Sequence, residues 1–190
     1  MYGDGGMVVT RNEEHVCRIR VLRDWGQKRK YVHEYRAFKC RMEGLQGAIL
    51  GIKLEYLDGW TERRRQHAAS YRQLLADNAL ELPPNPPNGR HVYHVYTNRV
   101  SERTRVQEEL SSRGIQTNIN YPIPVHLQSG YADLGYKAGD FPVSEALADT
   151  VLSLPMFPEL TGNQLEEVAT AVRAVTGRPE NRAAADRGRE

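Results

Sequence analysis

The stretch NINYPIPVHLQ, from Asn118 to Gln128, places two side chains that can do chemistry beside two prolines. Tyr121 carries a phenol and His126 an imidazole, and the prolines restrict the backbone that joins them. A stiff loop that carries His and Tyr is suited to binding a ligand. The same residues would also suit a structural proline-rich turn in which His126 is a satisfied surface group. Spacing alone leaves both interpretations open.

A second group of polar residues precedes a periodic apolar segment in FKCRMEGLQGAI, from Phe38 to Ile49. Lys39 and Arg41 lie just ahead of the helix that this segment predicts. Two cations beside a helix N-terminus can hold a phosphate, because their charge adds to that of the free backbone amides. The pattern therefore indicates a phosphate site, although it is not specific to one ligand.

Two further patterns favour structural roles. His91 and His94 form an H-x-x-H pair, but residues three apart on a strand face opposite sides, so no metal site is predicted. Arg63–Arg65 could contact phosphate or nucleic acid. Glu62 adjoins these arginines and no aromatic residues alternate with them, so the pattern favours a solvated helix face over a stacking platform.

Composition narrows the class of protein. The chain has 190 residues, 39% of them hydrophobic, and a formal charge of +2, which gives no support for a nucleic-acid partner. Its apolar runs are too short for a membrane span, and its first residues do not resemble a secretory signal. The two cysteines, Cys17 and Cys40, lack metal or redox spacing. These features predict a cytoplasmic protein with free thiols.

The first 41 residues predict the remnant of a larger domain. A glycine-rich turn leads into a strand, Met7–Thr10, as if a neighbouring strand should stand beside it. Asn12 is expected to cap a helix that ends near Trp25 and Gly26. Residues 27–39 are polar, basic and aromatic without helical periodicity, which predicts a loop.

Apolar residues then recur at spacings of three and four, which predicts one helix, or two nearly collinear ones, from about residue 42 to 76. At 1.5 Å per residue such a helix is roughly 50 Å long. Gly44, Gly47 and Gly51 lie in its first part, where they allow close approach of another backbone or merely mark a bend. We therefore expect a bridging helix over residues 42–81, followed by a proline-rich linker at 82–89.

Residues 90–177 predict a small α+β domain, and the polar tail 178–190 is expected to be disordered. Thr161 and Gln164 have the spacing of a capping box ahead of the last helix. The elements expected in this domain are strands at His91–Arg99, Ile115–Tyr121 and Val151–Leu154, and helices from Ser101 to before Gly114, at Pro142–Thr150, and from Thr161 to Gly177.

Several stretches together resemble one family. In order, they are GDGGMVVT, RVLRDWGQ, RMEGLQGAILGIKL, HVYHVY, RGIQT, YPIPVH and SLPMFPELT. The series is similar to the carboxyl half of the DegT/DnrJ/EryC1/StrS family of sugar aminotransferases that depend on pyridoxal phosphate, and it covers nearly all of Tyr2–Val175. The resemblance implies an α/β fold of the aspartate-aminotransferase type (fold type I). This chain would supply its carboxyl portion, namely the large-domain remnant, the long bridging helix and the small α+β domain.

The resemblance also bears on catalysis. In the family, the lysine that forms the Schiff base lies a few residues upstream of the segment that matches Gly3–Gly6. None of the five lysines of this chain stands in a matching context. We therefore expect no catalytic residue in this chain and no transamination by the chain alone.

Four residues match binding positions of the family. Where the family usually has Gly-x-Asn-x-Arg, this chain has Ala37 to Arg41, so that Lys39 replaces the asparagine and Arg41 is kept. The resemblance makes Lys39 and Arg41 contacts to the cofactor phosphate of a neighbouring subunit. It makes Tyr121 and His126 substrate-side residues, although Asn120 stands where the family commonly has a histidine.

The resemblance leaves two main hypotheses. The first is the carboxyl half of an enzyme that moves an amino group from glutamate or glutamine to a nucleotide-linked keto-sugar, acting as a homodimer or with a full-length or complementary chain. The alternative is a non-catalytic interaction module that dimerises with a full-length relative. A third possibility, a phosphate-binding protein, rests on Lys39 and Arg41 alone. None of these involves nucleic acid, a membrane or a metal.

Overall fold

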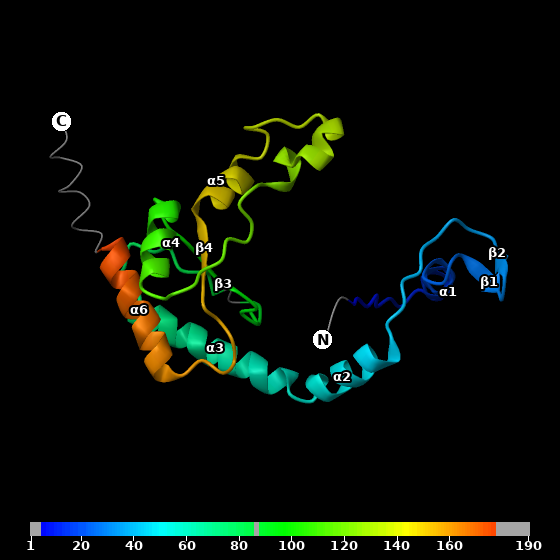
Figure 1. The fold of residues 1–190 in the computed structure, drawn as a ribbon, viewed down its shortest axis with the longest axis horizontal. Helices are drawn as coiled ribbons and strands as arrows, with labels where there is room; N and C mark the ends of the chain where they lie inside the picture. Colours follow the sequence, from blue (N-terminus) through cyan, green and yellow to red (C-terminus); the bar gives the residue numbers. More distant parts are fainter. Residues whose placement is uncertain (1–4, 86–87, 178–190) are drawn as a thin grey trace. The chain divides into compact units, whose positions relative to one another are not determined.

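The computed structural model describes residues 5–85 and 88–177, and the chain divides into two compact units, Met1–Asp58 and Gly59–Glu190 (Figure 1). The predicted disordered tail, 178–190, lies outside the described residues. None of the helices in the described ranges is long and apolar enough to cross a membrane. The predicted linker at 82–89 contains no helix or strand among its described residues.

Helix α1 (Glu13–Leu22) opens the first unit and begins at the predicted cap. The Asn12 side chain accepts hydrogen bonds from the backbone amides of Glu14 at 2.9 Å and His15 at 3.3 Å. The helix ends at Leu22, earlier than predicted, because the chain turns there and the Gly26 amide donates back to the Val21 carbonyl at 3.0 Å. The predicted strand at Met7–Thr10 is wrong: no described strand pairs with it, and it has no regular structure.

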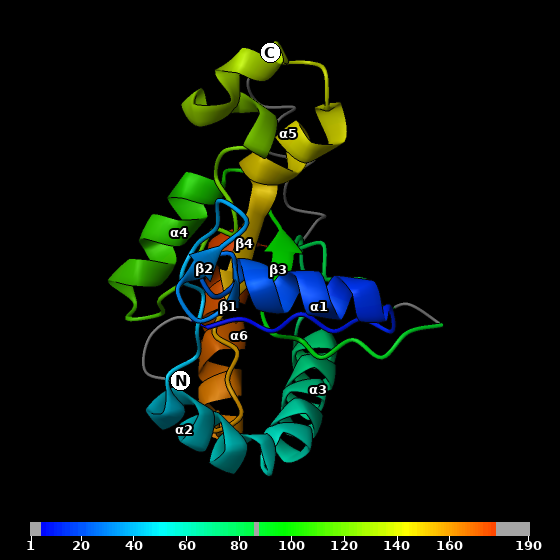
Figure 2. The ribbon, with the colours of Figure 1, turned by 90° about the vertical axis from the view of Figure 1, so that its right-hand side faces the viewer.

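A small antiparallel hairpin, β1 (Gln27–Arg29) and β2 (Val32–His33), stands where the sequence predicted a loop (Figure 2). Gly26 makes the hairpin possible. Its φ is +71°, and a Cβ there would lie 2.0 Å from the Tyr35 carbonyl oxygen. The Gly26 carbonyl in turn accepts from the amides of Glu34 and Tyr35. The loop prediction failed because two- and three-residue strands leave almost no periodic signal.

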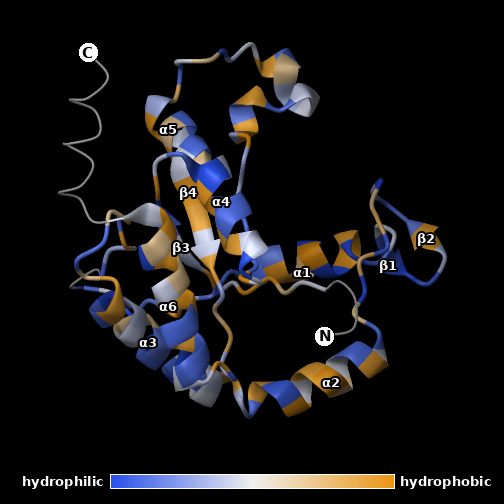
Figure 3. Ribbon diagram, turned by 60° about the vertical axis from the view of Figure 1, so that its left-hand side comes forward, coloured by the Kyte–Doolittle hydropathy of each residue, from blue (hydrophilic) through white to orange (hydrophobic). Residues whose placement is uncertain are grey.

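The predicted long helix is two helices, α2 (Gly44–Leu54) and α3 (Leu57–Leu74), separated by a turn at Glu55 and Tyr56. Figure 3 shows that α2 is apolar along much of its length. None of its residues is buried. By contrast, α3 contributes Ala68 and Tyr71 to the core of the second unit.

The second unit is built on strands β3 (Tyr96–Arg99) and β4 (Val151–Leu154), which pair antiparallel with Tyr96 opposite Leu154. Single bridges flank the pair, joining Glu81 to Arg99 and Asn118 to Ser153. The predicted strands at His91–Arg99 and Ile115–Tyr121 are therefore too long, whereas the one at Val151–Leu154 is confirmed. The chain at 91–95 cannot run extended, because Tyr93 has a φ of +48° and its amide donates to the His91 ring at 2.9 Å.

Three helices complete this unit: α4 (Arg103–Ser112), α5 (Pro142–Thr150) and α6 (Gly162–Thr176). The predicted capping box of α6 is confirmed, since Thr161 and Gln164 each accept from the other's backbone amide. The predicted Ser101 cap of α4 is wrong: Glu102 is the cap residue, with a φ of +54° and no side-chain cap bond.

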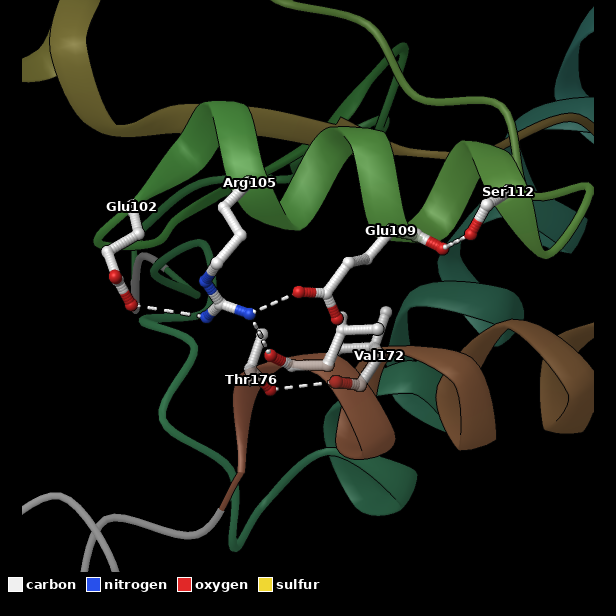
Figure 4. Close-up of polar contacts among 7 residues, drawn as sticks. Glu102, Arg105, Glu109, Ser112, Val172 and Thr176 are labelled. Carbon is white, nitrogen blue, oxygen red and sulfur yellow. Dashed lines mark hydrogen bonds and ion pairs between the residues drawn. The ribbon is translucent and has the colours of Figure 1, made fainter. Parts of the chain in front are cut away.

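The core of the second unit lies where α3, α4, α6 and the strands meet. Polar contacts surround it, and Figure 4 shows Arg105 of α4 pairing with Glu102 and Glu109. The Arg105 guanidinium also donates to the Val175 carbonyl of α6 at 3.3 Å, so one side chain ties two helices together. The buried apolar residues of this core are Ala68, Tyr71, Leu75, Leu80, Tyr93, Tyr96, Val100, Val106, Leu110, Ile115, Leu152, Leu154, Leu160, Leu165, Val168, Ala169, Ala171, Val172 and Val175.

Candidate functional site

Arg41 of the first unit is held by an ion pair with Asp24, at the turn between α1 and the hairpin. Gln27 adds a second hydrogen bond to the same carboxylate, at 2.8 Å. These two bonds, that of Arg41 first, hold the pKa of Asp24 below its ordinary value of 3.8. The guanidinium remains partly exposed, so Asp24 orients it without removing it from solvent.

A cavity of about 500 Å³ lies beside this ion pair. Lys30 stands over the Tyr31 ring at 5.1 Å, and the His33 ring is fixed by a 2.9 Å hydrogen bond between Nδ1 and the Trp25 carbonyl. Guanidinium and ammonium donors beside aromatic side chains suit an anion with a planar group attached. The lining residues are Trp25, Gln27, Lys30, Tyr31, His33 and Arg41.

Lys39 is placed differently from Arg41. Its backbone pairs with Asp24 in an isolated antiparallel bridge, supported by the bond from the Cys40 amide to the Arg23 carbonyl at 2.8 Å. Lys39 is exposed and is not among the residues that line the cavity. The structure thus brings one of the two predicted phosphate ligands, Arg41, into a cation-lined hollow, and leaves the other outside its lining.

Tyr121 and His126, the predicted substrate-side pair, lie in the second unit. Tyr121 is 74% exposed at the end of the segment that pairs with β4 through Asn118. The His126 side chain is only 8% exposed, and its Nε2 lies 3.0 Å from Oε1 of Glu145. No hydrogen bond or ring contact joins Tyr121 to His126 among the described residues. His126 is therefore a satisfied group held inside the loop, while Tyr121 is free to meet a ligand.

Glu145, in the first turn of α5, is a member of this site that sequence reasoning missed. Its carboxylate accepts from the Gly139 amide through both oxygens at 2.9 Å, from the Phe141 amide at 3.3 Å, and from His126. The Gly139 bond is the main cause of a pKa below the ordinary 4.5, and His126 adds to it. No short-range pattern links Glu145 to a histidine nineteen residues earlier, so the sequence held no signal for the pair.

The prediction of a solvated face for Arg63–Arg65 of α3 is wrong for Arg64 and Arg65, whereas Arg63 is exposed. Arg64 donates to the carbonyls of Tyr93, His94 and Met156, at 3.3, 3.1 and 2.8 Å. Arg65 donates to the His91 carbonyl at 2.9 Å. These arginines satisfy backbone carbonyls that irregular segments leave unpaired, which is a structural role.

The geometry gives no metal centre within residues 5–85 and 88–177, where no group of three or more His, Cys, Asp or Glu side chains is placed to hold an ion. His91 and His94 have other roles. The His91 ring accepts the Tyr93 amide and lies 4.2 Å from the Tyr93 ring, and the His94 carbonyl accepts from Arg64.

Comparison with known proteins identifies the family of this chain. Residues 1–173 match the DegT/DnrJ/EryC1/StrS aminotransferase family. The chain belongs to that family. Over 174 residues it is 44% identical to the "Pleiotropic regulatory protein" of Geobacillus stearothermophilus. This match covers 90% of this chain and 47% of that protein. Over 173 residues it is 40% identical to the dTDP-3-amino-3,4,6-trideoxy-alpha-D-glucose transaminase of Streptomyces venezuelae, covering 90% of this chain and 46% of the transaminase.

The fold comparison points the same way. The crystal structure of DesV from S. venezuelae superposes with a TM-score of 0.84 at 38% identity, over 90% of this chain and 46% of DesV. The expected fold, the mixed α/β carboxyl portion of a sugar aminotransferase, is confirmed. The chain spans about half the length of the curated relatives it matches.

The family depends on pyridoxal phosphate. The residues that line the cavity beside Arg41 fit the cofactor's phosphate because they offer it hydrogen-bond donors. Arg41 and Lys30 line one cavity together with the amide of Gln27 and the imidazole of His33. The first three can donate hydrogen bonds to an anion, whereas the Nδ1 of His33 already donates to the Trp25 carbonyl. The Asp24 carboxylate competes for the Arg41 guanidinium, so an anion must share or displace that partner.

Proposed function

We propose that this chain supplies the carboxyl half of a nucleotide-sugar aminotransferase that uses pyridoxal phosphate and moves an amino group from glutamate or glutamine to a nucleotide-linked keto-sugar. The observation that carries the proposal is the family match over residues 1–173. In this proposal the lysine that the reaction requires lies outside these 190 residues and completes the site.

Pyridoxal phosphate, when bound, supplies the electron sink on which amino transfer depends. In this proposal Arg41 donates to the cofactor phosphate, and Lys39 adds a second, more distant charge. The Asp24 ion pair keeps the guanidinium oriented before the phosphate arrives. A pre-oriented donor gains affinity because less conformational freedom is lost on binding.

Tyr121 and His126 bind the sugar nucleotide in the same proposal. The exposed Tyr121 hydroxyl can donate to or accept from a sugar or phosphate oxygen. The Nε2 of the His126 ring is held by Glu145, so in this proposal the Nδ1 edge is the part of the ring left for the substrate. The chain's own contribution is therefore binding and orientation rather than bond making.

A chimera tests the proposal. The segment of the S. venezuelae transaminase that this chain matches is replaced by residues 1–173, and amino transfer by the purified chimera is followed with the parent's own substrate. We expect a folded protein that retains the cofactor absorbance and measurable transfer. A folded chimera that neither retains cofactor nor transfers an amino group contradicts the proposal.

Point variants in the chimera separate the two roles. Arg41→Ala removes a charge-assisted hydrogen bond to an anion, which lowers cofactor affinity roughly ten- to hundredfold, about 1.5–3 kcal/mol. Arg36→Ala, an exposed arginine of the same segment outside the cavity lining, is the matched control and leaves affinity unchanged. His126→Ala spares cofactor affinity and raises the KM for the sugar nucleotide.

The alternative function, an interaction module that pairs with a full-length relative, is favoured by one observation. Helix α2 is apolar and none of its residues is buried. Equal cofactor affinity in the chimera and its Arg41→Ala variant, with tight association between this chain and a full-length relative, would place this alternative first.

A further inference from the structure

The loop between Tyr121 and Phe141 has almost no apolar anchor. It leaves the Asn118 bridge, passes through two short 3-10 turns, Val125–Leu127 and Ser129–Leu134, and returns as α5. Figures 1 and 2 both show these turns and α5 at one end of the second unit, away from α6. None of its residues belongs to the hydrophobic core. Something other than core burial must therefore fix its shape.

The carboxylate of Glu145 accepts hydrogen bonds from both ends of this loop. Glu145 accepts from the His126 ring at the start of the loop and from the amides of Gly139 and Phe141 at its end. The Gly139 amide reaches both carboxylate oxygens at 2.9 Å. Hydrogen bonds to an ionised acceptor are stronger than those between neutral groups. The bonds to Glu145 should therefore stabilise the loop more than hydrogen bonds between neutral groups would.

Aromatic contacts fix the histidine from the other side. The Phe141 ring lies 4.8 Å from the His126 ring, and the Tyr136 ring meets Phe141 edge-on at 5.1 Å. The imidazole is thus held by Glu145 at Nε2 and by a ring contact with Phe141. This combination sets the orientation of the imidazole and, while the ring is neutral, places its proton on Nε2.

We propose that Glu145 is a positioning residue that closes the 126–141 loop and sets the orientation and tautomer of His126 for the substrate. Its effect on substrate binding rests on the proposed function. The closure itself does not, because it concerns only contacts within this chain.

The test uses the full 190-residue chain at neutral pH, with Glu145→Ala, Glu145→Gln and the matched control Asp149→Ala. Asp149 is an exposed carboxylate four residues further along α5. In Glu145→Ala we expect the Gly139 and Phe141 amides to exchange with solvent roughly ten- to hundredfold faster, the factor that follows from losing bonds to a charged acceptor. The His126 ring nitrogens should then show two averaged tautomers by NMR.

Two comparisons keep the result specific. The Ser153 amide, bonded to the Asn118 carbonyl at 2.8 Å, should exchange at the same rate in every variant and thereby report an intact sheet. Glu145→Gln keeps a neutral acceptor, so its amide exchange should fall between that of the parent and that of the alanine variant. Asp149→Ala should match the parent.

Unchanged Gly139 exchange and unchanged His126 signals in Glu145→Ala would overturn the proposal, and if that variant unfolds, parent-like values in Glu145→Gln would do the same. The proposed function fails separately. If the amide and ring signals change as expected while His126→Ala leaves the KM of the chimera unchanged, Glu145 positions the histidine but the histidine does not bind substrate.

Discussion

Residues 5–58 and residues 59–177 differ in what holds them together. Among the described residues of the first unit, Gly26 alone is buried, and its role is to let two backbone segments approach. Every member of the hydrophobic core lies between Ala68 and Val175, in the second unit. The first unit relies instead on a helix cap, a short hairpin and the ion pair of Asp24 with Arg41.

The difference teaches that local hydrogen bonding can specify a shape without making it stable by itself. Isolated hairpins and helices of about ten residues are marginal in water. Apolar side chains of α2 remain in solvent, with Leu45 73% and Leu54 68% exposed. The second unit removes its apolar side chains from water, and that burial is the dominant favourable contribution to folding. We therefore expect the second unit to set the thermal unfolding transition of the chain.

The largest expected effect comes from the centre of that core. Tyr71 is fully buried, its ring lies 5.1 Å from that of Tyr96, and its hydroxyl donates to the Pro155 carbonyl at 3.0 Å. Tyr71→Ala should destabilise the second unit by about 3–5 kcal/mol, as expected for loss of a buried aromatic ring. Urea denaturation followed by circular dichroism measures the change.

The matched variant in the first unit is Leu45→Ala. Since this leucine is 73% exposed, we expect a change within about 0.5 kcal/mol. A comparable loss for Leu45 and Tyr71 would mean that α2 is packed in solution and that the contrast between the two units is wrong.

The next largest effects come from replacing two glycines by alanine, and the two replacements should change stability in opposite directions. Gly26→Ala places a Cβ against the Tyr35 carbonyl in a left-handed conformation, which costs at least about 1–2 kcal/mol and should open the hairpin. Gly51→Ala meets nothing within 4 Å, so it should strengthen α2 by up to about 1 kcal/mol. Exchange of the Glu34 amide, which is bonded to the Gly26 carbonyl, reports the first change, and helical circular dichroism reports the second. Retained protection of Glu34 in Gly26→Ala would count against this account.

Helix caps allow the same chemistry to be compared in both units. Thr161→Ala removes the capping box of α6, and Asn12→Ala removes the cap of α1. Each loses about 1 kcal/mol of helix stability. Only the α6 change should lower the melting temperature of the main transition, because α6 belongs to the core, whereas the α1 change should appear as local fraying. A shift of the main transition by Asn12→Ala would show that the two units unfold together.

The sequence predicted well where periodicity or local chemistry determines structure. The apolar face of α6, its capping box and the Asn12 cap all follow from short-range spacing. It failed at short pairings such as the β1–β2 hairpin, and spacing could not decide between one long helix and two, so the break before Leu57 was left open. In the site, Arg41 could be named from its position in a motif. Glu145 could not, because only the folded loop brings it to His126.

The smallest expected effect is a difference in how two carboxylates, Asp24 and Glu145, respond to salt. The pKa of each lies below its ordinary value. The pKa of Asp24 is lowered chiefly by the hydrogen bond from the Arg41 side chain, and that of Glu145 chiefly by the hydrogen bond from the Gly139 backbone amide. In each case the folded pKa lies below the ordinary value of 3.8 or 4.5, so the contribution to stability is present above that value and is lost as the pH falls through the folded pKa. Acid should therefore release the Arg41 guanidinium in one unit and the 126–141 loop in the other.

Salt separates the two causes. Raising ionic strength from about 0.01 to about 1 M shortens the Debye length from about 30 to about 3 Å, which weakens the attraction between partly exposed charges. The ion pair of Asp24 is of this kind, with 43% of the Arg41 side chain and 33% of the Asp24 side chain exposed. The pKa of Asp24 should rise toward its ordinary value, while that of Glu145, lowered chiefly by a 2.9 Å hydrogen bond from the neutral Gly139 amide, should move less. Carboxyl carbon NMR titrations at the two salt concentrations measure both, and equal shifts would mean that the His126 charge, rather than the Gly139 amide, governs Glu145.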